Sequence, residues 1–489
     1  MLKTTWIALV LGFWSSIYLI DVFLKTRSQF SESYQNFQQK WGVQLLTAQI
    51  RCYTTYFNRW IFRVGQWFPW FSYYWFELGM WFGIVCIFAS VALLVMTLVK
   101  AFTEEKPEQV LTPVMPGVNV PVQHLSYFFA VLLVSGILHE LGHAIAAVRE
   151  QVMINGFGVF VMVVYPGAFV DLHTEHLLAI PPKRQLKIYC AGIWHNFVLV
   201  LIGIVMLVTM PTTMSMLYAT GEGVVVTELA KNSPVAGPRG FAVGSKLKSI
   251  NGCPLLTGDD WGRCLSDVVF YPQSGYCQQI GKIKEKDYTV QLYKGQGGQV
   301  ECCRNDSASD LCFYYKIGSS AENLEKIYQC LTARKTTEAP RCQRNSDCLQ
   351  VRKTVCLYPS LDNSSRLIRV LHDKGPPVIY VGDPYLFGFT VSVSGYIPKY
   401  NFLPFYLPQI VDTFCKYLIS LSGALAILNA VPCYALDGQW IFQAFIESYL
   451  TSLIPNPLDR QSLVSLGLLF GTLILMANVA LALFSLLFA

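Results

Sequence analysis

Long apolar runs alternate with polar segments along the chain and predict its main helices. A helix that crosses a membrane needs about 20 apolar residues, and several runs reach that length. They cover residues 6–24, 78–99, 125–148, 186–210, 408–430 and 463–488. A shorter run at 440–450 predicts a short helix. Lys3 precedes the first run and no small-residue cleavage site follows it, so we expect a retained signal-anchor helix there.

Residues 154–171 break the helical pattern. They are rich in β-branched and aromatic side chains and contain a Pro166-Gly167 turn signal, which predicts two short strands joined by a turn. Non-helical backbone at membrane depth survives only inside protein or beside water. We therefore expect this hairpin to line the cavity of the active site.

The composition agrees with a polytopic membrane protein. Of the 489 residues, 53% are hydrophobic and only 14% are charged, whereas soluble domains carry about 25% charged residues. The net charge of +6 is too small over this length to indicate nucleic-acid binding. Residues 60–76 are dense in aromatic rings, which favours a belt at the membrane interface, with core packing as the alternative.

The cysteines are unevenly distributed. Ten of the fifteen fall between Cys253 and Cys356, which predicts a disulfide-bonded module on an oxidising side of the membrane. Their pairing cannot be deduced from sequence. Asn305 and Asn363 begin N-x-[ST] sequences and are candidate glycosylation sites, compatible with a luminal location.

Basic residues give partial information on topology. Lys183, Arg184 and Lys187 favour a cytosolic start for the span at 186–210, which then exits toward the luminal module. Four full crossings before that module place the N-terminus in the lumen. A cytosolic N-terminus, favoured by the basic residues at 25–63, requires either 78–99 or the hairpin to be re-entrant.

One apolar run carries a metal-binding pattern, His139-Glu140-Leu141-Gly142-His143. Helical residues four apart lie on one face, so the two histidines can share one tetrahedral Zn²⁺. Glu140 lies beside them and can take a proton from an attacking water without being a ligand. The match could arise by accident, but two imidazoles and a carboxylate within a membrane span need a partner, and a metal ion is such a partner.

A third protein ligand is required, and Asp437 is the best candidate. It follows a proline that ends the preceding helix and precedes Gly438, which permits close backbone approach. Helix N-capping is the alternative role for this aspartate. The competing cluster Asp171, His173, Glu175 and His176 is more typical of a polar loop after the hairpin.

Three motifs in this order resemble those of the site-2 proteases, a family of intramembrane zinc metalloproteases. They are H-E-x-x-H at His139–His143, G-x-x-x-N at Gly192–Asn196, and N-x-x-P-x-x-x-x-D-G at Asn429–Gly438. The cysteine-rich insert and the chain length are similar to animal members of the family. Residues 100–121 lack the serine-rich run that those members usually carry.

The resemblance implies one Zn²⁺ per chain and membrane-anchored substrates. These would be single transmembrane helices of transcription factors, such as the sterol regulatory element-binding proteins and the membrane-bound factor of the unfolded protein response, cut first on the luminal side by a serine protease. It also implies a multi-pass protein of the Golgi or endoplasmic reticulum membrane, in contact with lipid, whose active site faces the cytosolic side and which does not contact nucleic acid directly.

Several further residues are candidates for contact with substrate or oxyanion. They are Asn196, Gly192, Asn429, Gly156 and Gly158. A hydrogen bond between packed helices is the alternative role for Asn196. A substrate helix must unwind before attack, and an edge strand of the hairpin could replace its lost hydrogen bonds.

Residues 222–256 resemble the opening strands and loop of a PDZ domain, with Gly244-Ser245 where a Gly-Asp pair is usual. The cysteine-rich region would interrupt this domain, and residues 378–393 could close it. The expected fold is thus a polytopic α-helical membrane protein with a membrane-embedded β-hairpin and a luminal PDZ-like, disulfide-rich domain.

Four domains are expected along the chain. Residues 1–121 form N-terminal membrane helices, 122–210 and 396–489 form the two parts of the catalytic membrane core, and 211–395 form the luminal domain.

Two other classes of function compete with a protease. A catalytically inactive relative that escorts membrane proteins would not need a general base, so Glu140 disfavours it. A metal transporter would carry polar residues along several spans, and these spans are mostly apolar.

Overall fold

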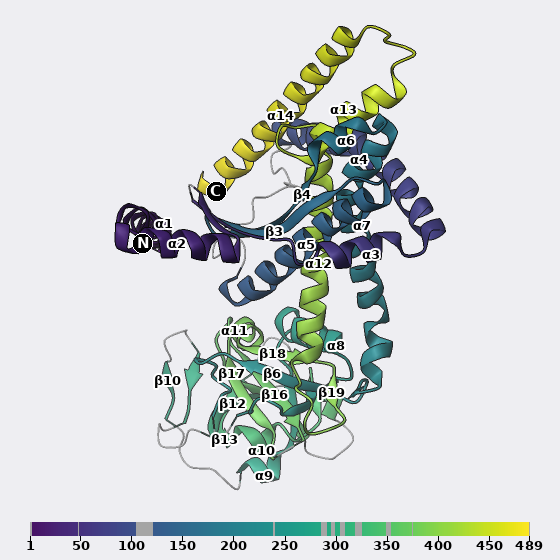
Figure 1. The fold of residues 1–489 in the computed structure, drawn as a ribbon. Helices are drawn as coiled ribbons and strands as arrows, with labels where there is room; N and C mark the ends of the chain where they lie inside the picture. Colours follow the sequence, from purple (N-terminus) through teal and green to yellow (C-terminus); the bar gives the residue numbers. More distant parts are fainter. Residues whose placement is uncertain are drawn as a thin grey trace. The chain divides into compact units, whose positions relative to one another are not determined.

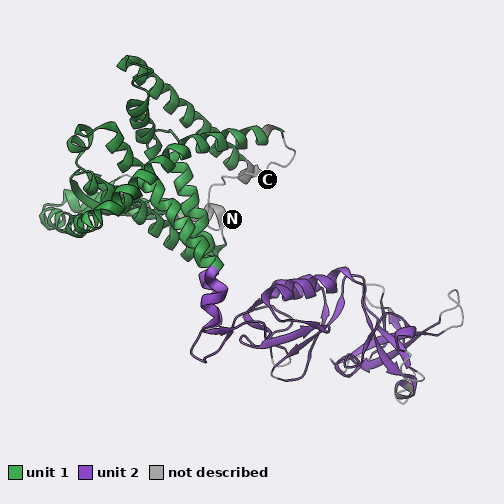
Figure 2. Cartoon of the chain, turned by 90° about the vertical axis from the view of Figure 1, so that its right-hand side faces the viewer, with its two compact units in different colours: residues 1–208, 412–489 green, residues 209–411 purple. Residues whose placement is uncertain are grey.

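The computed structural model divides the chain into two compact units. Unit 1 comprises 1–208 and 412–489, and unit 2 comprises 209–411 (Figure 2). The structure describes residues 2–46, 48–103, 121–237, 240–284, 291–294, 299–303, 309–317, 325–348, 354–373 and 375–488. Candidate glycosylation residue Asn305 and most of the linker at 100–121 lie outside this set.

Unit 1 is largely helical (Figure 1). Its helices are α1 (Leu2–Thr26), α2 (Ser28–Trp41), α3 (Asn58–Gln66), α4 (Pro69–Thr103), α5 (Leu125–Arg149, preceded by the 3₁₀ turn Val122–His124), α6 (Thr174–Ala179), α7 (Pro182–Ser215), α12 (Leu407–Ala430), α13 (Asp437–Tyr449) and α14 (Pro457–Phe488). The two boundaries between the units fall within helices, at 208/209 in α7 and at 411/412 in α12.

Among the described residues, five helices are long and apolar enough to cross a membrane. They are α4, α5, α7, α12 and α14, with the 3₁₀ turn extending α5. The runs at 78–99, 125–148, 186–210, 408–430 and 463–488 are thus confirmed as helices, and the short helix at 440–450 lies within α13. The first run is helical within α1, which is not among the five, so its role as an anchor stays a prediction.

The predicted hairpin forms, but its turn was predicted in the wrong place. Strands β3 (Ile154–Met162) and β4 (Tyr165–Leu172) pair antiparallel and turn at Val163, whose φ is 58°. Pro166 lies inside β4, opposite Val161. A proline fits there because β4 ends the sheet, so that position needs no ladder donor on its outer side.

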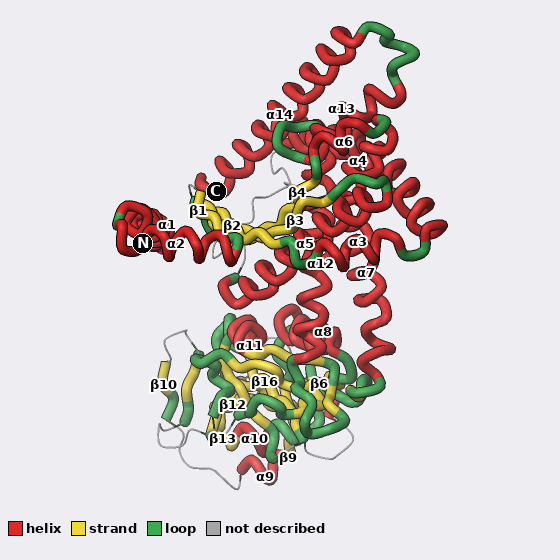
Figure 3. Tube along the Cα trace, in the orientation of Figure 1, coloured by secondary structure: helices red, strands yellow, loops and turns green. Residues whose placement is uncertain are grey.

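Two short strands that the sequence pattern did not indicate extend the hairpin into a sheet. Strands β1 (Val43–Leu46) and β2 (Gln49–Thr54) join it in the order β1-β2-β3-β4, within the helical unit (Figure 3). The outer edge of β4 faces α5, where Val170 N–H donates to the Glu140 carboxylate. The sheet therefore reaches the residues of the H-E-x-x-H motif.

Aromatic side chains at 60–76 are mostly exposed rather than packed in the core. Trp67, Phe68 and Trp70 are 66%, 74% and 76% exposed, although Phe76 is buried. For most of these rings the core-packing alternative is therefore wrong. Their exposure beside the start of α4 suits a membrane interface.

The described residues of unit 2 form two large sheets with separate apolar cores and two small two-stranded sheets. The first has the order β17-β16-β7-β6-β18, with β8 paired to β7. The second has the order β13-β12-β15-β9-β14 and lies in the chain between α8 and β16. Segments near 224–250 and 378–394 therefore share one sheet, which the cysteine-rich region interrupts.

The elements of unit 2 are mostly short. The first sheet, its helices and the small β5-β19 pair use β5 (Tyr218–Ala219), β6 (Val224–Leu229), β7 (Lys246–Ile250), β8 (Cys253–Pro254), α8 (Gly258–Phe270), β16 (Arg366–His372), β17 (Val378–Gly382), α11 (Pro384–Thr390), β18 (Val391–Ser394) and β19 (Ile397–Pro398). The insert uses β9 (Gly275–Gln279), α9 (Ile280–Lys284), β10 (Tyr293–Lys294), β11 (Val300–Glu301), β12 (Asp310–Ile317), β13 (Glu325–Thr332), α10 (Ala333–Thr336), β14 (Arg341–Cys342), the 3₁₀ turn Asn345–Cys348 and β15 (Thr354–Pro359).

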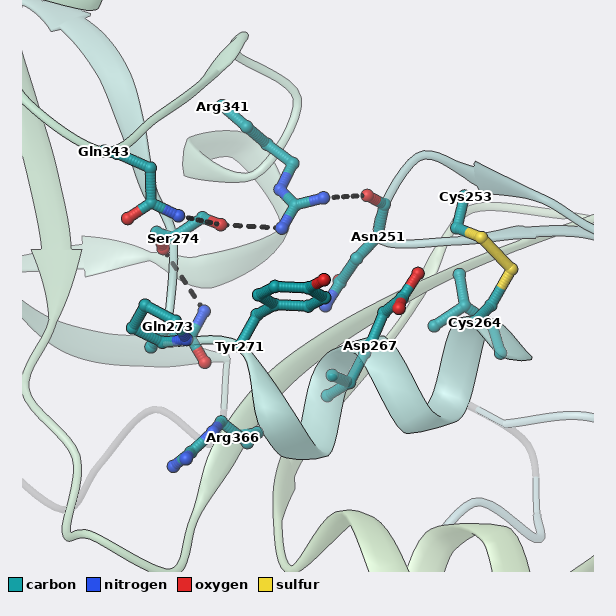
Figure 4. Close-up of a pocket in the computed structure, with 13 residues that line it drawn as sticks. Asn251, Cys253, Cys264, Asp267, Tyr271, Gln273, Ser274, Arg341, Gln343 and Arg366 are labelled. Atoms are coloured by element: carbon teal, nitrogen blue, oxygen red, sulfur yellow. Dashed lines mark hydrogen bonds between the residues drawn. A yellow bond between two sulfur atoms is a disulfide. The ribbon is translucent and has the colours of Figure 1, made fainter. Parts of the chain in front are cut away.

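A polar seam joins the insert to the first sheet. Arg341 of β14 donates to the Asn251 carbonyl and, at 2.6 Å, to the Ser274 hydroxyl (Figure 4). A cavity of about 430 Å³ opens beside this seam, with Tyr271 and the Cys253–Cys264 disulfide in its lining (Figure 4). Two Arg341 N–H groups are bound to protein acceptors, so this arginine links the insert to the first sheet.

The predicted disulfide module is confirmed. All ten cysteines of the cluster are paired, as Cys253–Cys264, Cys277–Cys348, Cys302–Cys312, Cys303–Cys330 and Cys342–Cys356. The five free cysteines lie in unit 1. Candidate glycosylation residue Asn363 is exposed just before β16.

This division of cysteines predicts a thiol count. Alkylation of the denatured, unreduced protein should label five cysteines, and alkylation after reduction should label all fifteen. Peptide mass spectrometry would measure both numbers. Labelling of any residue between Cys253 and Cys356 before reduction would contradict the pairing.

Candidate metal centre

Three side chains from two distant segments meet inside unit 1. His139 and His143 lie one turn apart on α5, and Asp437 is the first residue of α13. The Nε2 atoms of the histidines are 3.2 Å apart, and Asp437 Oδ2 lies 2.8 Å from His139 Nε2 and 3.3 Å from His143 Nε2. Both imidazoles are buried, being 6% and 7% exposed. The three atoms are therefore mutual neighbours in an interior site.

The spacing fits a tetrahedral zinc ion. Zinc binds nitrogen and oxygen at about 2.0–2.1 Å, so two ligand atoms of a tetrahedral site are separated by about 3.3 Å. The three observed distances are close to that edge length. The residues present thus fit the metal, since they supply three corners and leave a fourth for water or substrate.

The proton positions on the histidines agree with this fit. His143 Nδ1 lies 2.8 Å from the Ile188 carbonyl, which can only accept, so Nδ1 carries the proton and the Nε2 lone pair is free for a metal. His139 Nδ1 lies 3.0 Å from the side-chain amide of Asn196. Both rings are therefore oriented through their Nδ1 atoms.

Asn196 is the partner of a metal ligand. Its side chain is fully buried, and its Oδ1 has no partner among the described residues. With His139 Nε2 on a metal, Nδ1–H is a donor, and an amide turned to present Oδ1 satisfies both groups at once. The observed bond joins α7 to α5, as the alternative of a hydrogen bond between packed helices expected, and it ends on a metal ligand. Contact of Asn196 with substrate or oxyanion stays a prediction.

Gly192 provides the space for this arrangement. A Cβ built on it would overlap His143 Nε2 and lie 2.6 Å from His139 Nε2. A larger residue at position 192 would occupy the position of the ligand atoms. The glycine and asparagine of the G-x-x-x-N motif therefore contact the same pair of histidines.

Asp437 is placed by the loop between α12 and α13. The N-cap residue of α13 is Leu436, and no side-chain capping bond is made there, so the capping alternative for Asp437 is wrong. A Cβ on Gly438 would overlap the Val431 carbonyl. The Asp-Gly pair therefore lets the loop fold tightly enough to direct its carboxylate to α5.

Glu140 lies beside the metal group without joining it. Its Oε2 accepts a 3.0 Å hydrogen bond from Val170 N–H of β4. The carboxylate is partly buried between α5 and the edge of the sheet. Glu140 is next to His139 in sequence but does not belong to the group of three ligand atoms.

The three remaining candidates for contact with substrate do not belong to the metal group. They are Gly156, Gly158 and Asn429. A Cβ on Gly156 would overlap the Tyr53 ring, and one on Gly158 the Phe169 ring, so both glycines accommodate aromatic side chains. Asn429 is half-buried in the last turn of α12. Contact of these residues with substrate stays a prediction.

Two competing ligand sets do not form a second site. In the described parts of the chain, His173 caps α6 by accepting from His176 N–H, and neither belongs to a metal-binding group. Cys277, Cys342 and Cys348 do cluster. All three are in disulfides, which removes their thiolates from metal binding.

A buried ion-pair network holds the helices around the centre. Lys187 is 6% exposed and lies 2.8 Å from the Glu77 carboxylate. Arg184 pairs with Glu150 one turn earlier on α7. Because Lys187 precedes Ile188, which accepts from His143, this network fixes α7 where it orients a ligand.

Two backbone groups of the site could not be predicted from sequence. They are the Ile188 carbonyl and the Val170 N–H, and backbone groups leave no residue-specific signal.

Comparison with known proteins agrees with this geometry. The model of peptidase family M50 matches residues 127–475, which include every residue of the metal group. The chain belongs to peptidase family M50. As a member of that family it is an intramembrane zinc metallopeptidase, and His139, His143 and Asp437 form its candidate zinc site.

A plant protein is also similar to this chain along most of its length. The membrane-bound transcription factor site-2 protease homolog of Arabidopsis thaliana is 25% identical over 444 residues, covering 80% of this chain and 84% of the relative. The resemblance to site-2 proteases noted from three short motifs therefore extends over both units.

Replacement of Gly192 tests the packing of this M50 site. Gly192→Ala should lower zinc affinity by at least the roughly 10- to 100-fold that a lost outer-shell partner costs, because the methyl group displaces the ligand nitrogens. Gly203→Ala is the matched control on the same helix, where the nearest atom is a movable Ile419 side-chain carbon. Elemental analysis after dialysis against graded chelator measures both. Equal zinc retention in the two variants would contradict the packing described here.

Proposed function

We propose that this M50 peptidase cleaves transmembrane helices of membrane-anchored transcription factors after a prior luminal cut, and so releases their cytosolic domains. Sterol regulatory element-binding proteins and the membrane-bound factor of the unfolded protein response are the proposed substrates. The metal centre carries the proposal, because its three ligand atoms lie within 3.3 Å of one another beside Glu140 on an apolar helix. The name of the plant relative supports the substrate class.

The residues divide the chemistry between them. His139, His143 and Asp437 would hold a Zn²⁺ ion, which would supply Lewis acidity at the site. Glu140 takes a proton from the attacking water and delivers it to the leaving amine. Asn196 and the Ile188 carbonyl hold the imidazoles in the tautomer that ligation requires.

The edge of β4 is the proposed docking position for an unwound substrate. Val170 N–H points to this edge, and Ala168, two residues earlier, directs its N–H to the same side. In this structure α5 lies against the edge, since a Cβ on Gly136 would be 3.9 Å from Ala168 N, so docking requires β4 and α5 to separate. A substrate carbonyl that takes the Val170 N–H would release Glu140 for proton transfer. Helix-breaking residues in the substrate should favour this step.

The active site is proposed to face the cytosolic side of a Golgi or endoplasmic reticulum membrane. His143 lies six residues before the end of α5 at Arg149, and α7 begins nearby in sequence with Lys183 and Arg184. Basic residues concentrate at cytosolic ends of spans. The disulfides of unit 2 are typical of a luminal module.

The first sheet of unit 2 is proposed to be PDZ-like. Its strands come from both sides of the cysteine-rich insert, as expected for an interrupted domain. A luminal module of this size could exclude substrates whose luminal part has not been trimmed, which would explain a requirement for the earlier cut.

Substitution of Glu140 separates a protease from an inactive escort. Glu140→Gln should retain one zinc per chain and lose cleavage of a helical substrate by about 10²- to 10⁴-fold, because the general base is removed. Glu175→Gln, on exposed α6, is the matched control and should cleave normally. Loss of zinc from Glu140→Gln would identify Glu140 as a ligand, and undiminished cleavage would exclude it as the base.

Removal of one edge donor tests substrate docking. Ala168→Pro deletes an outward N–H without removing a ladder bond to β3, and should slow cleavage about 2- to 10-fold by loss of one hydrogen bond. Ala168→Val, which keeps the N–H, is the control. Initial rates on a purified transmembrane substrate measure the effect. Equal rates for both variants would place the substrate elsewhere.

A further inference from the structure

A pocket in unit 1, distinct from the metal centre, lies where α3 meets the end of α5. It has a volume of about 660 Å³, within the range of small-molecule sites. Its polar lining comes from Asn58, Arg59, Arg63, Gln66 and Gln151, and its apolar lining from Phe62, Val148, Val152, Met153 and Ile154. A pocket with one polar and one apolar wall suits an amphipathic ligand.

The sequence of α3 accounts for this lining. Its pocket residues recur at spacings of three and four, which places them on one face of the helix. Ile61 and Gly65 do not line the pocket and are buried. A Cβ on Gly65 would lie 2.6 Å from Val148 Cγ1, so glycine lets α3 approach α5 closely. The pocket is therefore held against the helix that carries His139 and His143.

The pocket lies at the end of two membrane spans. The span of α5 ends at Arg149 and that of α4 begins at Pro69. The two ends are joined, because Arg149 Nη2 donates to the Pro69 carbonyl at 3.2 Å. Exposed Trp67 and Phe68 lie between α3 and α4. Rings at this level anchor a protein in the headgroup layer, so α3 borders that layer.

Two guanidinium groups at the pocket have no counter-ion among the residues that the structure describes. Arg59 and Arg63 are exposed, and in the described parts of the chain neither makes a hydrogen bond or an ion pair. In contrast, Lys183 pairs with Glu77 and Arg184 with Glu150 at the neighbouring helix ends. Guanidinium groups bind phosphate through paired N–H donors. The pocket thus combines two uncommitted cations with an apolar wall at a membrane boundary.

We propose that this pocket binds an anionic phospholipid, with the headgroup on Arg59 and Arg63 and the acyl chains along Phe62 and Val148. The complementary charge and the adjoining aromatic rings favour a lipid over a soluble anion. Because α3 packs on the last turns of α5, the bound lipid would brace the helix that ends six residues after His143. The inference does not depend on the proposed substrates.

Titration of phosphatidylserine into the delipidated full-length protein, followed by native mass spectrometry, tests this site. Arg59→Gln/Arg63→Gln should bind about 30-fold more weakly, since each surface cation contributes about 1 kcal/mol, or about fivefold in affinity. Arg59→Lys/Arg63→Lys should retain most of the affinity. Arg27→Gln/Lys40→Gln removes the same charge from exposed positions at α1 and α2 and should bind like the unmodified protein.

A second variant and a competing anion distinguish a phospholipid from a soluble phosphate as the ligand. Phe62→Gln keeps both cations and should weaken phosphatidylserine binding through loss of the apolar wall, with an unchanged melting temperature because the side chain is exposed. Inorganic phosphate should not displace the lipid. Unchanged binding by Arg59→Gln/Arg63→Gln, equal losses in the Arg27→Gln/Lys40→Gln control, or displacement by phosphate would each overturn the proposal.

Discussion

The arrangement of unit 1 around its metal centre depends on one electrostatic requirement. His139, His143 and Asp437 lie so close together that they need a cation between them. A carboxylate taken out of water carries a desolvation penalty of several kcal/mol, and two imidazole lone pairs 3.2 Å apart repel each other. A divalent ion bound by all three side chains would offset both unfavourable terms through its bonds to the ligand atoms. The Nδ1 partners of both histidines support this state, since they fix the protons away from the metal.

The centre is built by close packing of helices rather than by flexible loops. Residues of α5, α7 and the α12–α13 loop converge on it, although nearly 300 residues separate His139 from Asp437. Gly192 removes the side chain that would fill the site, and Lys187 holds α7 by its pair with Glu77. Unit 2 is stabilised in another way, by disulfides, which suits small sheets with limited cores.

Much of the membrane unit could be predicted because its signals are local. Apolar runs define the spans, the H-E-x-x-H spacing defines one helix face, and Asp437 follows a helix-ending proline. The strands within residues 25–57 were not predicted, because β1 and β2 are only four and six residues long and form by pairing, β1 with β2 and β2 with β3. The hairpin turn was predicted at Pro166-Gly167, but an edge strand such as β4 tolerates a proline whose missing N–H would have pointed away from the sheet. Disulfide pairs and the role of Asn196 depend on three-dimensional proximity alone.

Zinc-edge X-ray absorption on the purified protein would identify the ligands of the metal. We expect a shell of nitrogen and oxygen at about 2.0–2.2 Å with two imidazole signatures, and a changed shell or lost zinc in Asp437→Asn. A sulfur shell near 2.3 Å, or an Asp437→Asn spectrum identical to that of the unmodified protein, would contradict this expectation.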